Sequence, residues 1–445
     1  MSYRYSIYSG EPDVDRLLAI VQQAGGNRIV VAPYVKLVFA DLTPHQAERL
    51  RSLGLKVTRV ETIRPMLVRP PRQVTGLGDV HYTLDDLLRL MAWDRLRSSL
   101  PHPITGEGYV VAVLDSGIRS GHERLVAHVI DEANFSASAT TDDAVDHGTG
   151  VASVVTAVAP GAHVLSCKVI GDDGVGDEES VCLAIDDVLR RCASGDPICA
   201  INLSLGAPDT GDPSDPLRIA CQEAFRQGVF VAAAAGNDGP DSSTINTPAC
   251  DRLVMAVGSC APDPFTINEF SSRGPTREGL IKPDIVLFGN NIETASAKGD
   301  AAYGVKSGTS YAAPIAAAGA AVAKQVTDYF VAQGIPPGVV QQFARYVPGS
   351  IDITAEWELE EGADPFWSMG MISIKPPDAP PGKDNTYGYG VPMGDVIVDF
   401  MESQVAPAMV GGVSSLAGGI LALVMMVTLA RSIVARTISL SLIHI

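Results

Sequence analysis

The stretch that decides the fold reads VAVLDSG, residues 111–117: four apolar residues, then an aspartate, a serine and a glycine. A short, uninterrupted apolar run of this kind is typical of a strand buried on both faces of a parallel sheet. Asp115 then stands at the carboxyl end of the strand, the edge where open α/β sheets hold their ligands and reacting groups. The stretch therefore predicts both a buried sheet and a candidate functional residue.

The same pattern repeats outward from this stretch, from residue 108 to about residue 324. Short apolar runs alternate there with segments of helical periodicity. The runs predicted as strands are 110–114, 163–169, 200–205, 229–235 and 253–257, and the predicted helices lie near 148–158, 179–193 and 214–227. Such alternation predicts an α/β fold, a parallel sheet with helices on both faces.

Residues 1–66 have the pattern of a small α+β domain that precedes this region. Apolar strand-like runs and helical segments follow one another as β-α-β-β-α-β, a ferredoxin-like order. Thr43, Pro44 and Gln46 give the signature of a helix start, with a capping threonine and a proline in the first turn. Residues 67–82 are rich in proline and glycine, which predicts an exposed linker, and a helix capped by Thr83 should follow.

The C-terminal part of the chain changes character. Residues 348–386 are acidic and rich in proline and glycine, which predicts a surface excursion of the 83–400 domain, whereas 403–430 contain no charged residue. That second segment is long enough to cross a bilayer, although a buried helix is the alternative. Arginines in the tail, 431–445, favour a cytoplasmic tail by the positive-inside rule. The N-terminal sequence shows no signal peptide and favours the opposite orientation, so the side of the membrane stays open.

Composition narrows the class of protein further. The chain has 445 residues and a formal net charge of −18, which argues against nucleic acid as a partner because phosphate binding needs clustered Lys and Arg. Seven cysteines occur without any CxxC pair, so a structural zinc site is not expected. Buried free thiols are one interpretation of these cysteines, and one or two disulfides are the other.

Two further motifs join Asp115. His147 lies in DHGTG, residues 146–150, and Ser310 lies in SGTSYAAP, residues 307–314. Separately, each has an ordinary structural explanation: a turn aspartate, a structural histidine and a helix N-cap. Together, in this order, they predict a catalytic triad in which Ser310 is the nucleophile, His147 the general base and Asp115 its orienting carboxylate.

Other predicted strands end in residues that would serve such a triad. Asn237 follows the strand at 229–235 and could donate its amide to an oxyanion, together with the Ser310 N–H. Gly206 would let a substrate backbone approach and pair as an added strand. The residues predicted to contact substrate are Ser204, Leu205, Gly206, Ala234, Ala235 and Gly236.

These motifs resemble those of the subtilisin-like serine peptidases, the subtilases or peptidase S8 family. The resemblance rests on DSG, HGT, AAGN and GTSYAAP, and it extends to SSRGP at 271–275 and KPD at 282–284. It implies a subtilisin-like catalytic domain and the roles given above for Asp115, His147, Asn237 and Ser310. It also implies that residues 1–66 are an inhibitory propeptide, similar to the I9 inhibitor family, that is removed by a cut in the linker.

The sequence departs from the family pattern at several positions. Gly150 stands where the family has a second histidine, Arg119 where an acidic residue is common, and 287–289 read LFG where Ala-Pro-Gly is usual. The segment between His147 and Pro160 is too short for the family's common calcium loop, so neither a metal nor a cofactor is expected.

The leading hypothesis is thus a membrane-anchored endopeptidase that cleaves proteins or peptides through an acyl-enzyme on Ser310. The alternative is a non-catalytic, peptide-binding membrane scaffold on the same fold. A nucleotide-binding protein is disfavoured, because the sequence after the 110–114 strand contains neither GxGxxG nor GxxxxGK.

Overall fold

The computed structural model describes five ranges of the chain: 2–10, 13–66, 81–262, 265–332 and 373–399. Four sequence predictions fall wholly or mainly outside these ranges. They concern the linker, the surface excursion, the charge-free segment 403–430 and the tail at 431–445. Within the described ranges, no helix is both long and apolar enough to cross a membrane.

The N-terminal unit has the predicted β-α-β-β-α-β order. Its elements are β1 (Tyr3–Tyr8), α1 (Val14–Gln23), β2 (Asn27–Ala32), β3 (Leu37–Leu42), α2 (Pro44–Ser52) and β4 (Lys56–Arg59). The strands form one antiparallel sheet in the order β2-β3-β1-β4. The capping box predicted for α2 is present, because Thr43 accepts from the Gln46 N–H while the Gln46 side chain accepts from the Thr43 N–H.

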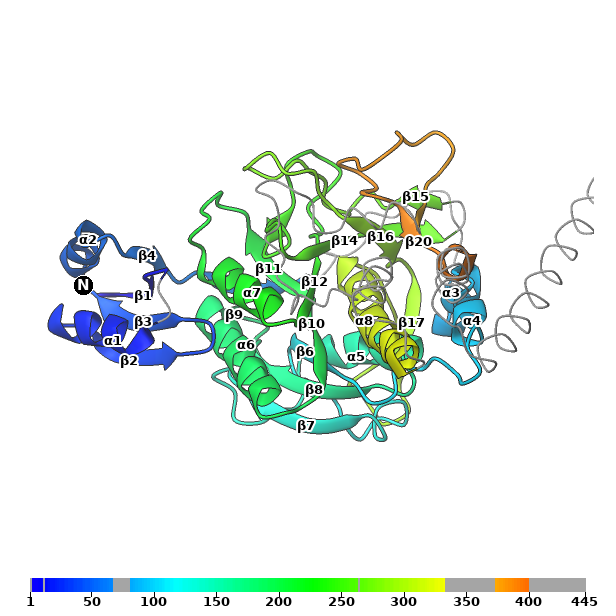
Figure 1. Ribbon diagram of the computed structural model, residues 1–445, viewed down its shortest axis with the longest axis horizontal. Coiled ribbons are helices and arrows are strands. Elements are labelled where there is room, and N and C mark those ends of the chain that lie inside the picture. The colour runs from blue at the N-terminus through cyan, green and yellow to red at the C-terminus, as the bar shows by residue number, and fades with distance from the viewer. Residues whose placement is uncertain (1, 11–12, 67–80, 263–264, 333–372, 400–445) are drawn as a thin grey trace, which may run out of the picture.

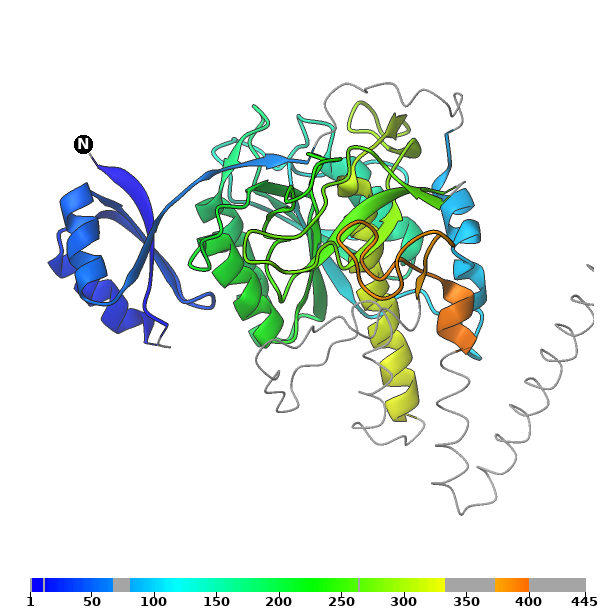
Figure 2. The same cartoon turned by 90° about the horizontal axis from the view of Figure 1, so that it is seen from above.

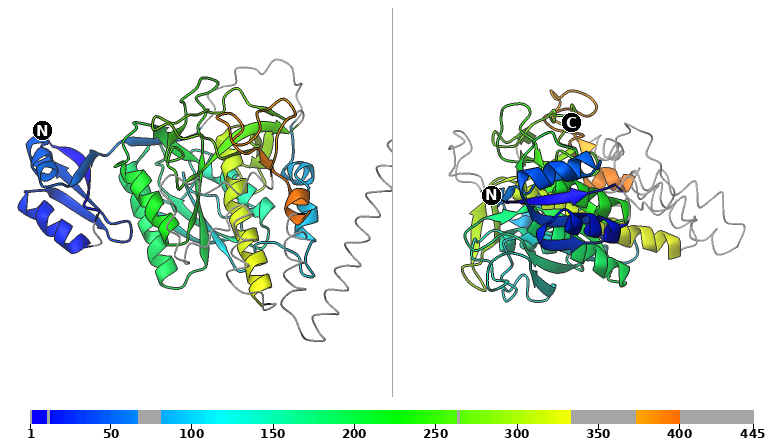
Figure 3. Two further views of the ribbon diagram at one scale, coloured as in Figure 1. Left: turned by 45° about the horizontal axis from the view of Figure 1, so that its top comes forward. Right: turned by 90° about the vertical axis from the view of Figure 1, so that its left-hand side faces the viewer.

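The two faces of this small sheet have different neighbours. Leu17 and Val21 of α1 and Leu50 of α2 are buried in a cluster of the unit's own. Leu37 and Phe39 of β3 instead belong to a cluster that contains residues of the larger body. The unit therefore packs against the body through its sheet, as the blue domain in Figure 1 and Figure 3 does beside α6 and α7.

A largely parallel sheet forms the centre of the body. Its strands are β6 (Val110–Asp115), β7 (Val129–Asn134), β8 (His163–Lys168), β10 (Ile198–Leu203), β12 (Phe230–Ala234), β14 (Met255–Pro262), β15 (Phe265–Ile267) and β16 (Ile285–Phe288). They lie in the order β15-β14-β12-β10-β6-β8-β7, with β16 also paired to β14 and β15 antiparallel at its edge. The predicted parallel sheet is confirmed, and β14 runs on to Pro262 because its last residues pair with β15.

Helices cover both faces of this sheet. The helices are α5 (Gly148–Val158), α6 (Glu178–Ala193), α7 (Pro216–Arg226) and α8 (Thr309–Ala332). Along β6, Val111 and Val113 join the cluster that holds α5 and α8, whereas Val110, Ala112 and Leu114 join the cluster that holds α6 and α7. This alternation is the two-residue period of a strand buried on both faces.

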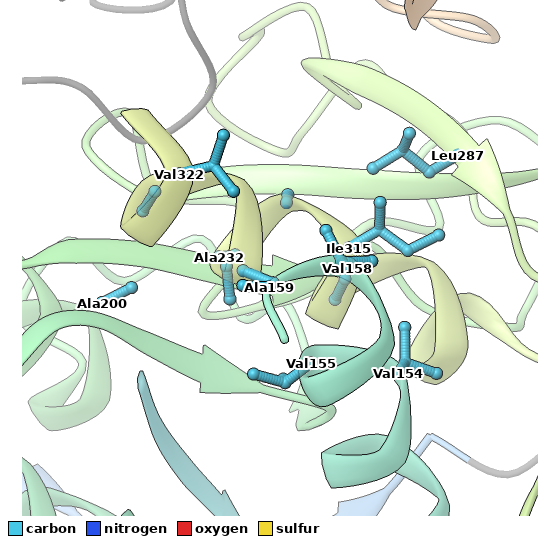
Figure 4. Packing of buried hydrophobic residues seen from close by; sticks show 14 of the residues in the cluster. Val154, Val155, Val158, Ala159, Ala200, Ala232, Leu287, Ile315 and Val322 are labelled. Atoms are coloured by element: carbon cyan, nitrogen blue, oxygen red, sulfur yellow. The ribbon is translucent and has the colours of Figure 1, made fainter. Parts of the chain in front are cut away.

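The core beneath the candidate site consists mainly of small side chains. Figure 4 shows Val154, Val155 and Val158 of α5 near Ile315 and Val322 of α8 and the strand residues Ala200 and Ala232. Because alanine and valine dominate here, α5 and α8 can lie close to each other and to the sheet. That packing holds the first turns of both helices at the carboxyl edge of the strands.

Smaller elements complete the described fold. They are α3 (Leu84–Leu90), α4 (Trp93–Arg97), a four-stranded sheet of β13 (Asn246–Thr247), β11 (Leu205–Pro208), β5 (Thr62–Pro65) and β9 (Gly176–Asp177), the hairpin of β17 (Ile292–Ala295) with β18 (Tyr303–Lys306), and the pair β19 (Ser373–Ile374) and β20 (Val391–Pro392). The predicted Thr83 cap is present, because its hydroxyl accepts from the Asp86 N–H. All seven cysteines are free thiols, which corresponds to the first interpretation of the cysteine count.

Candidate active site

Asp115 and His147 meet at the carboxyl edge of the sheet. Asp115 is the last residue of β6, and His147 immediately precedes α5. The His147 Nδ1 lies 2.7 Å from Asp115 Oδ1, and both side chains are buried, with exposed fractions of 0% and 1%. A buried carboxylate beside Nδ1 fixes the imidazole tautomer and stabilises the imidazolium form. This pairing leaves His147 Nε2 unbonded among the described residues, as a group able to take a proton.

A second carboxylate, Asp143, orders the loop that carries His147. Its Oδ1 accepts the Ser116 hydroxyl at 2.7 Å, and its Oδ2 accepts both the N–H and the hydroxyl of Thr149, at 2.9 and 2.7 Å. The Ser116 hydroxyl in turn accepts the Gly148 N–H at 3.0 Å. Asp143 therefore ties the end of β6 to the first turn of α5, and sequence reasoning did not single it out.

Asp146 fastens the same loop from the other side. Its carboxylate accepts the Ala297 N–H at 2.7 Å and the Ser296 hydroxyl at 2.9 Å, and it pairs with Lys306 at 3.2 Å. Burial opposes ionisation of this group, but Lys306 and the donated hydrogen bonds outweigh that effect and lower its pKa. Asp146 is thus held as a carboxylate.

Side chains from other elements lie close to Gly150, the residue that stands where the family has a histidine. A Cβ built on Gly150 would lie 2.9 Å from Thr294 Oγ1, 3.1 Å from Lys306 Nζ and 3.2 Å from Tyr311 Cε1. These neighbours fill the space that a side chain at residue 150 would need. A side chain at residue 150 would therefore have to displace these neighbours.

Ser310 is the second residue of α8 and is fully buried. Its hydroxyl donates to the carbonyl oxygen of Met66 at 2.8 Å and lies 3.3 Å from the Ser204 carbonyl oxygen. In a first helical turn the backbone N–H groups have no partner within the helix, and the helix dipole there favours negative charge. Ser310 is thus a helical residue rather than the N-cap considered from the sequence.

Asn237 reaches the same carbonyl oxygen from the far side of the site. It follows β12, and its Nδ2 donates to the Met66 oxygen at 2.6 Å. Its Oδ1 accepts the N–H and the hydroxyl of Thr309, both at 3.0 Å. The side chain is therefore oriented by the residue that precedes Ser310, a role that the sequence did not reveal although Thr309 lies within the SGTSYAAP motif.

The Met66 carbonyl reaches the site because β5 occupies the cleft. Leu205 of β11 pairs with Pro65 and Gly206 with Arg64, while β9 pairs with β5 from the other side. The Met66 N–H donates to the Ser204 carbonyl at 3.1 Å. Figure 2 shows this blue segment extending from the N-terminal domain into the body. The strand addition expected of a substrate is made here by the chain's own residues 62–66.

The predicted substrate-contacting residues take different parts around Met66. Ser204 and the first two residues of β11, Leu205 and Gly206, form the segment against which residues 64–66 lie. Ala234 shares a cluster with Met66, whereas Ala235 packs into the cluster on the opposite face of the sheet. The link between Ala235 and the surroundings of Met66 is through Asn246, whose N–H donates to the Ala235 carbonyl oxygen at 3.0 Å.

Gly236 and Asn246 complete the surroundings of the Met66 side chain. A Cβ on Gly236 would lie 2.5 Å from Ser272 Oγ and 2.9 Å from Asn246 Nδ2, so the glycine leaves room for both side chains. Asn246 Nδ2 lies 3.5 Å from the Met66 sulfur. Asn246 is a second residue that sequence reasoning missed, since it lies nine positions after Asn237 in a turn-rich segment without a recognisable motif.

Comparison with known proteins agrees with this geometry. Residues 106–390 match the Subtilase family, which is more than half of the chain. Serine protease AprX of Bacillus subtilis (strain 168) is 33% identical over 257 residues, covering 50% of this chain and 58% of AprX. Subtilisin BL of Lederbergia lenta is 36% identical over 232 residues, covering 50% of this chain and 78% of that protein.

A third relative is much longer than this chain. Membrane-bound transcription factor site-1 protease of Rattus norvegicus is 31% identical over 261 residues, which are 55% of this chain and 24% of the relative. The chain thus spans a little over half of AprX and about a quarter of this protease. From the family match and the similarity to Subtilisin BL, the chain belongs to the subtilase family of serine peptidases.

Proposed function

We propose that this chain is a serine endopeptidase that hydrolyses peptide bonds through an acyl-enzyme on Ser310. The observation that carries the proposal is the position of the Met66 carbonyl oxygen, 2.8 Å from Ser310 Oγ and 2.6 Å from Asn237 Nδ2. A peptide carbonyl held beside a nucleophilic hydroxyl and a preorganised amide donor is a setting for acyl transfer, which further requires the hydroxyl to turn its proton from this carbonyl to His147 Nε2, an atom without a partner among the described residues.

Each group then has a defined part in the reaction. Ser310 Oγ bonds to the carbonyl carbon while its proton passes to His147 Nε2, and Asp115 stabilises the imidazolium that forms. Asn237 Nδ2 and the Ser310 N–H carry the charge that develops on the carbonyl oxygen. His147 next protonates the leaving nitrogen as the C–N bond breaks. Water finally attacks the acyl-enzyme and gives a proton to His147, which passes a proton to Ser310 Oγ as the acyl C–Oγ bond breaks and the carboxylic acid product leaves.

Residues 1–66 act, in this proposal, as an intramolecular inhibitor that is removed by cleavage of the Met66–Leu67 bond. Three kinds of contact support the inhibitor role. Residues 62–66 pair as a strand within the cleft. Asp186 of α6 accepts the N–H groups of Tyr34 and Val35 at 2.6 and 3.0 Å, and Lys36 pairs with Glu223 of α7 at 2.7 Å. Because the interface extends beyond the cleft, the cut segment should stay bound for a time.

The test is to express the full chain beside Ser310→Ala and a matched control, Ser307→Ala. Ser307 lies three residues upstream, and its hydroxyl contacts Asn290 rather than Met66. We expect the parent and Ser307→Ala to react with a fluorophosphonate probe and to show a new N-terminus at Leu67, and Ser310→Ala to do neither. Folded parent protein that neither reacts nor is cut would contradict the proposal and favour the non-catalytic scaffold.

We further propose that residues 403–430 attach the enzyme to a membrane. Support comes from the sequence alone, which has 28 residues without a charge followed by Arg431 and Arg436. The full chain should stay with membranes after carbonate extraction, and a chain ending at residue 400 should not. Protection of the catalytic domain from added protease would then decide on which side of the membrane it lies. Release of both chains by carbonate would contradict the attachment.

A further inference from the structure

The side chain of Met66 lies in a pocket whose walls belong to β11 and to the loop after β12. The exposed fraction of Met66 is 7%, and the residue packs in the main hydrophobic cluster of the body. A Cβ built on Gly206 would lie 2.5 Å from Met66 Cε, so the end of the methionine chain rests on that glycine. The pocket thus accommodates a long, unbranched side chain that lies close to a backbone.

The side-chain amide of Asn246 lies beside the sulfur, the one polar atom of the Met66 side chain. Its Nδ2 lies 3.5 Å from the Met66 sulfur, within the range of a hydrogen bond to sulfur, and 3.0 Å from Asp238 Oδ2. The two hydrogens of the amide group therefore have two acceptors, one on the enzyme and one on the bound residue. The exposed fraction of Asn246 is 7%, so an amide hydrogen without a partner there would be costly.

This arrangement distinguishes methionine from side chains of similar size. Norleucine has the same length but a methylene in place of sulfur, and it would leave one amide hydrogen of Asn246 unsatisfied. Leucine branches at Cγ and ends at Cδ, one atom short of the Cε that lies at Gly206. An acidic side chain would meet the carboxylate of Asp238, which lies at the same amide.

We propose that Asn246 is a specificity-determining residue that favours methionine immediately before the cleaved bond. The inference rests on the proposed peptidase function and adds to it a substrate class: extended peptides with methionine at that position. The residue positions a donor toward the substrate side chain and takes no part in bond breaking.

The test uses peptides with the sequence of residues 62–65, followed by a variable residue X in place of Met66 and then by leucine. X is methionine, norleucine, leucine, phenylalanine, lysine or glutamate, and kcat/KM is measured for the processed enzyme. We expect methionine to exceed norleucine by about three- to tenfold, the usual range for one net hydrogen bond. Glutamate should be the poorest substrate of the series.

The variant Asn246→Ala tests whether the Asn246 amide is the cause of the preference for methionine. The ratio of methionine to norleucine should fall to about one, because neither side chain then meets an amide hydrogen that needs an acceptor. The matched control is Thr244→Ala, two residues before Asn246. The Thr244 hydroxyl donates to the Asp241 carbonyl oxygen and not to Met66, so the ratio for this variant should equal that of the parent.

Several outcomes would overturn the inference. A parent ratio near one, a ratio that survives in Asn246→Ala, or lysine or phenylalanine preferred over methionine would each reject methionine selection by Asn246 and leave the peptidase function intact. Enzyme that hydrolyses none of the peptides and does not react with a fluorophosphonate would reject both the function and the inference.

Discussion

Thr309 fixes the orientation of Asn237. Its N–H and its hydroxyl lie 3.0 Å from the same Asn237 Oδ1. A backbone N–H can only donate, so the atom facing it must be the amide oxygen, and Nδ2 is then directed to the Met66 carbonyl oxygen. The helix that carries the proposed nucleophile therefore also orients the proposed oxyanion donor.

Thr309→Val should lower kcat about tenfold and leave KM nearly unchanged. Valine removes one of the two hydrogen bonds to Asn237 and keeps the shape of the side chain, a loss of about 1–1.5 kcal/mol. Asn237→Ala should cost more, about 10²–10³ in kcat. Steady-state kinetics on the processed enzyme measure both effects. Thr309→Ser keeps the hydroxyl and should retain most activity, and equal losses in the serine and valine variants would contradict the explanation.

Asp143→Ala should lower both stability and activity. Removal of the carboxylate leaves the N–H of Thr149 and the buried hydroxyl of Ser116 without their acceptor, a cost of about 1–3 kcal/mol for each such group. The unfolding free energy should be measured by denaturant titration in a Ser310→Ala background, which prevents self-digestion. Asp142→Ala is the control, because that carboxylate contacts only Thr140 among the described residues. Similar losses in the two variants would show that Asp143 has no special role.

Retention of the N-terminal domain should weaken as the pH rises. Glu178 accepts the Glu61 N–H at 2.8 Å, and burial, then the nearby carboxyl of Asp215, raises the pKa of Glu178 to about 9 from an ordinary 4.5. We expect loss of the domain to expose Glu178 to water, which removes the burial that raises its pKa; this effect should outweigh loss of the Glu61 N–H bond, which lowers the pKa. The complex then holds a proton that the separated enzyme releases, so between about pH 4.5 and 9 each unit of pH weakens binding by up to about tenfold.

Size-exclusion chromatography of the cut complex at several pH values measures this effect. Glu178→Gln removes the titrating group and should flatten the pH dependence. Glu179→Gln loses the ion pair with Arg4 at the same interface, so it should weaken binding at every pH and keep the slope. An unchanged slope in Glu178→Gln would assign the proton to another group.

Gly150→His, which restores the family residue, should destabilise this chain. The space beside Gly150 is already taken by Thr294, Lys306 and Tyr311, so the larger side chain overpacks the site at a cost of about 1–3 kcal/mol. A lower melting temperature in the Ser310→Ala background checks the prediction. A variant as stable as the parent would show that the neighbours move aside without cost.

Most of the central sheet could be predicted from the sequence because its strands are buried on both faces. Such strands are mostly apolar, so β6 and β12 appear as hydrophobic runs, and β8 (HVLSCK) and β10 (ICAINL) contain only a few polar residues. The edge strand β7 reads VIDEAN and is half exposed, so it has no such run and was missed. The hairpin of β17 and β18 escaped prediction for the same reason, since Tyr303 and Val305 of β18 are exposed.

By itself, the sequence predicted the candidate triad Asp115, His147 and Ser310, together with Asn237 and Gly206. Their chemistry needs particular residue types set in local turns and small-residue helices, and those are written in short motifs. Only the tertiary structure decided which residues support and occupy the site. Asp143, Asn246 and Thr309 act through hydrogen bonds across loops, and Met66 enters the cleft from 244 positions before Ser310. Such partners are chosen by proximity in the folded chain, which no local pattern of residues records.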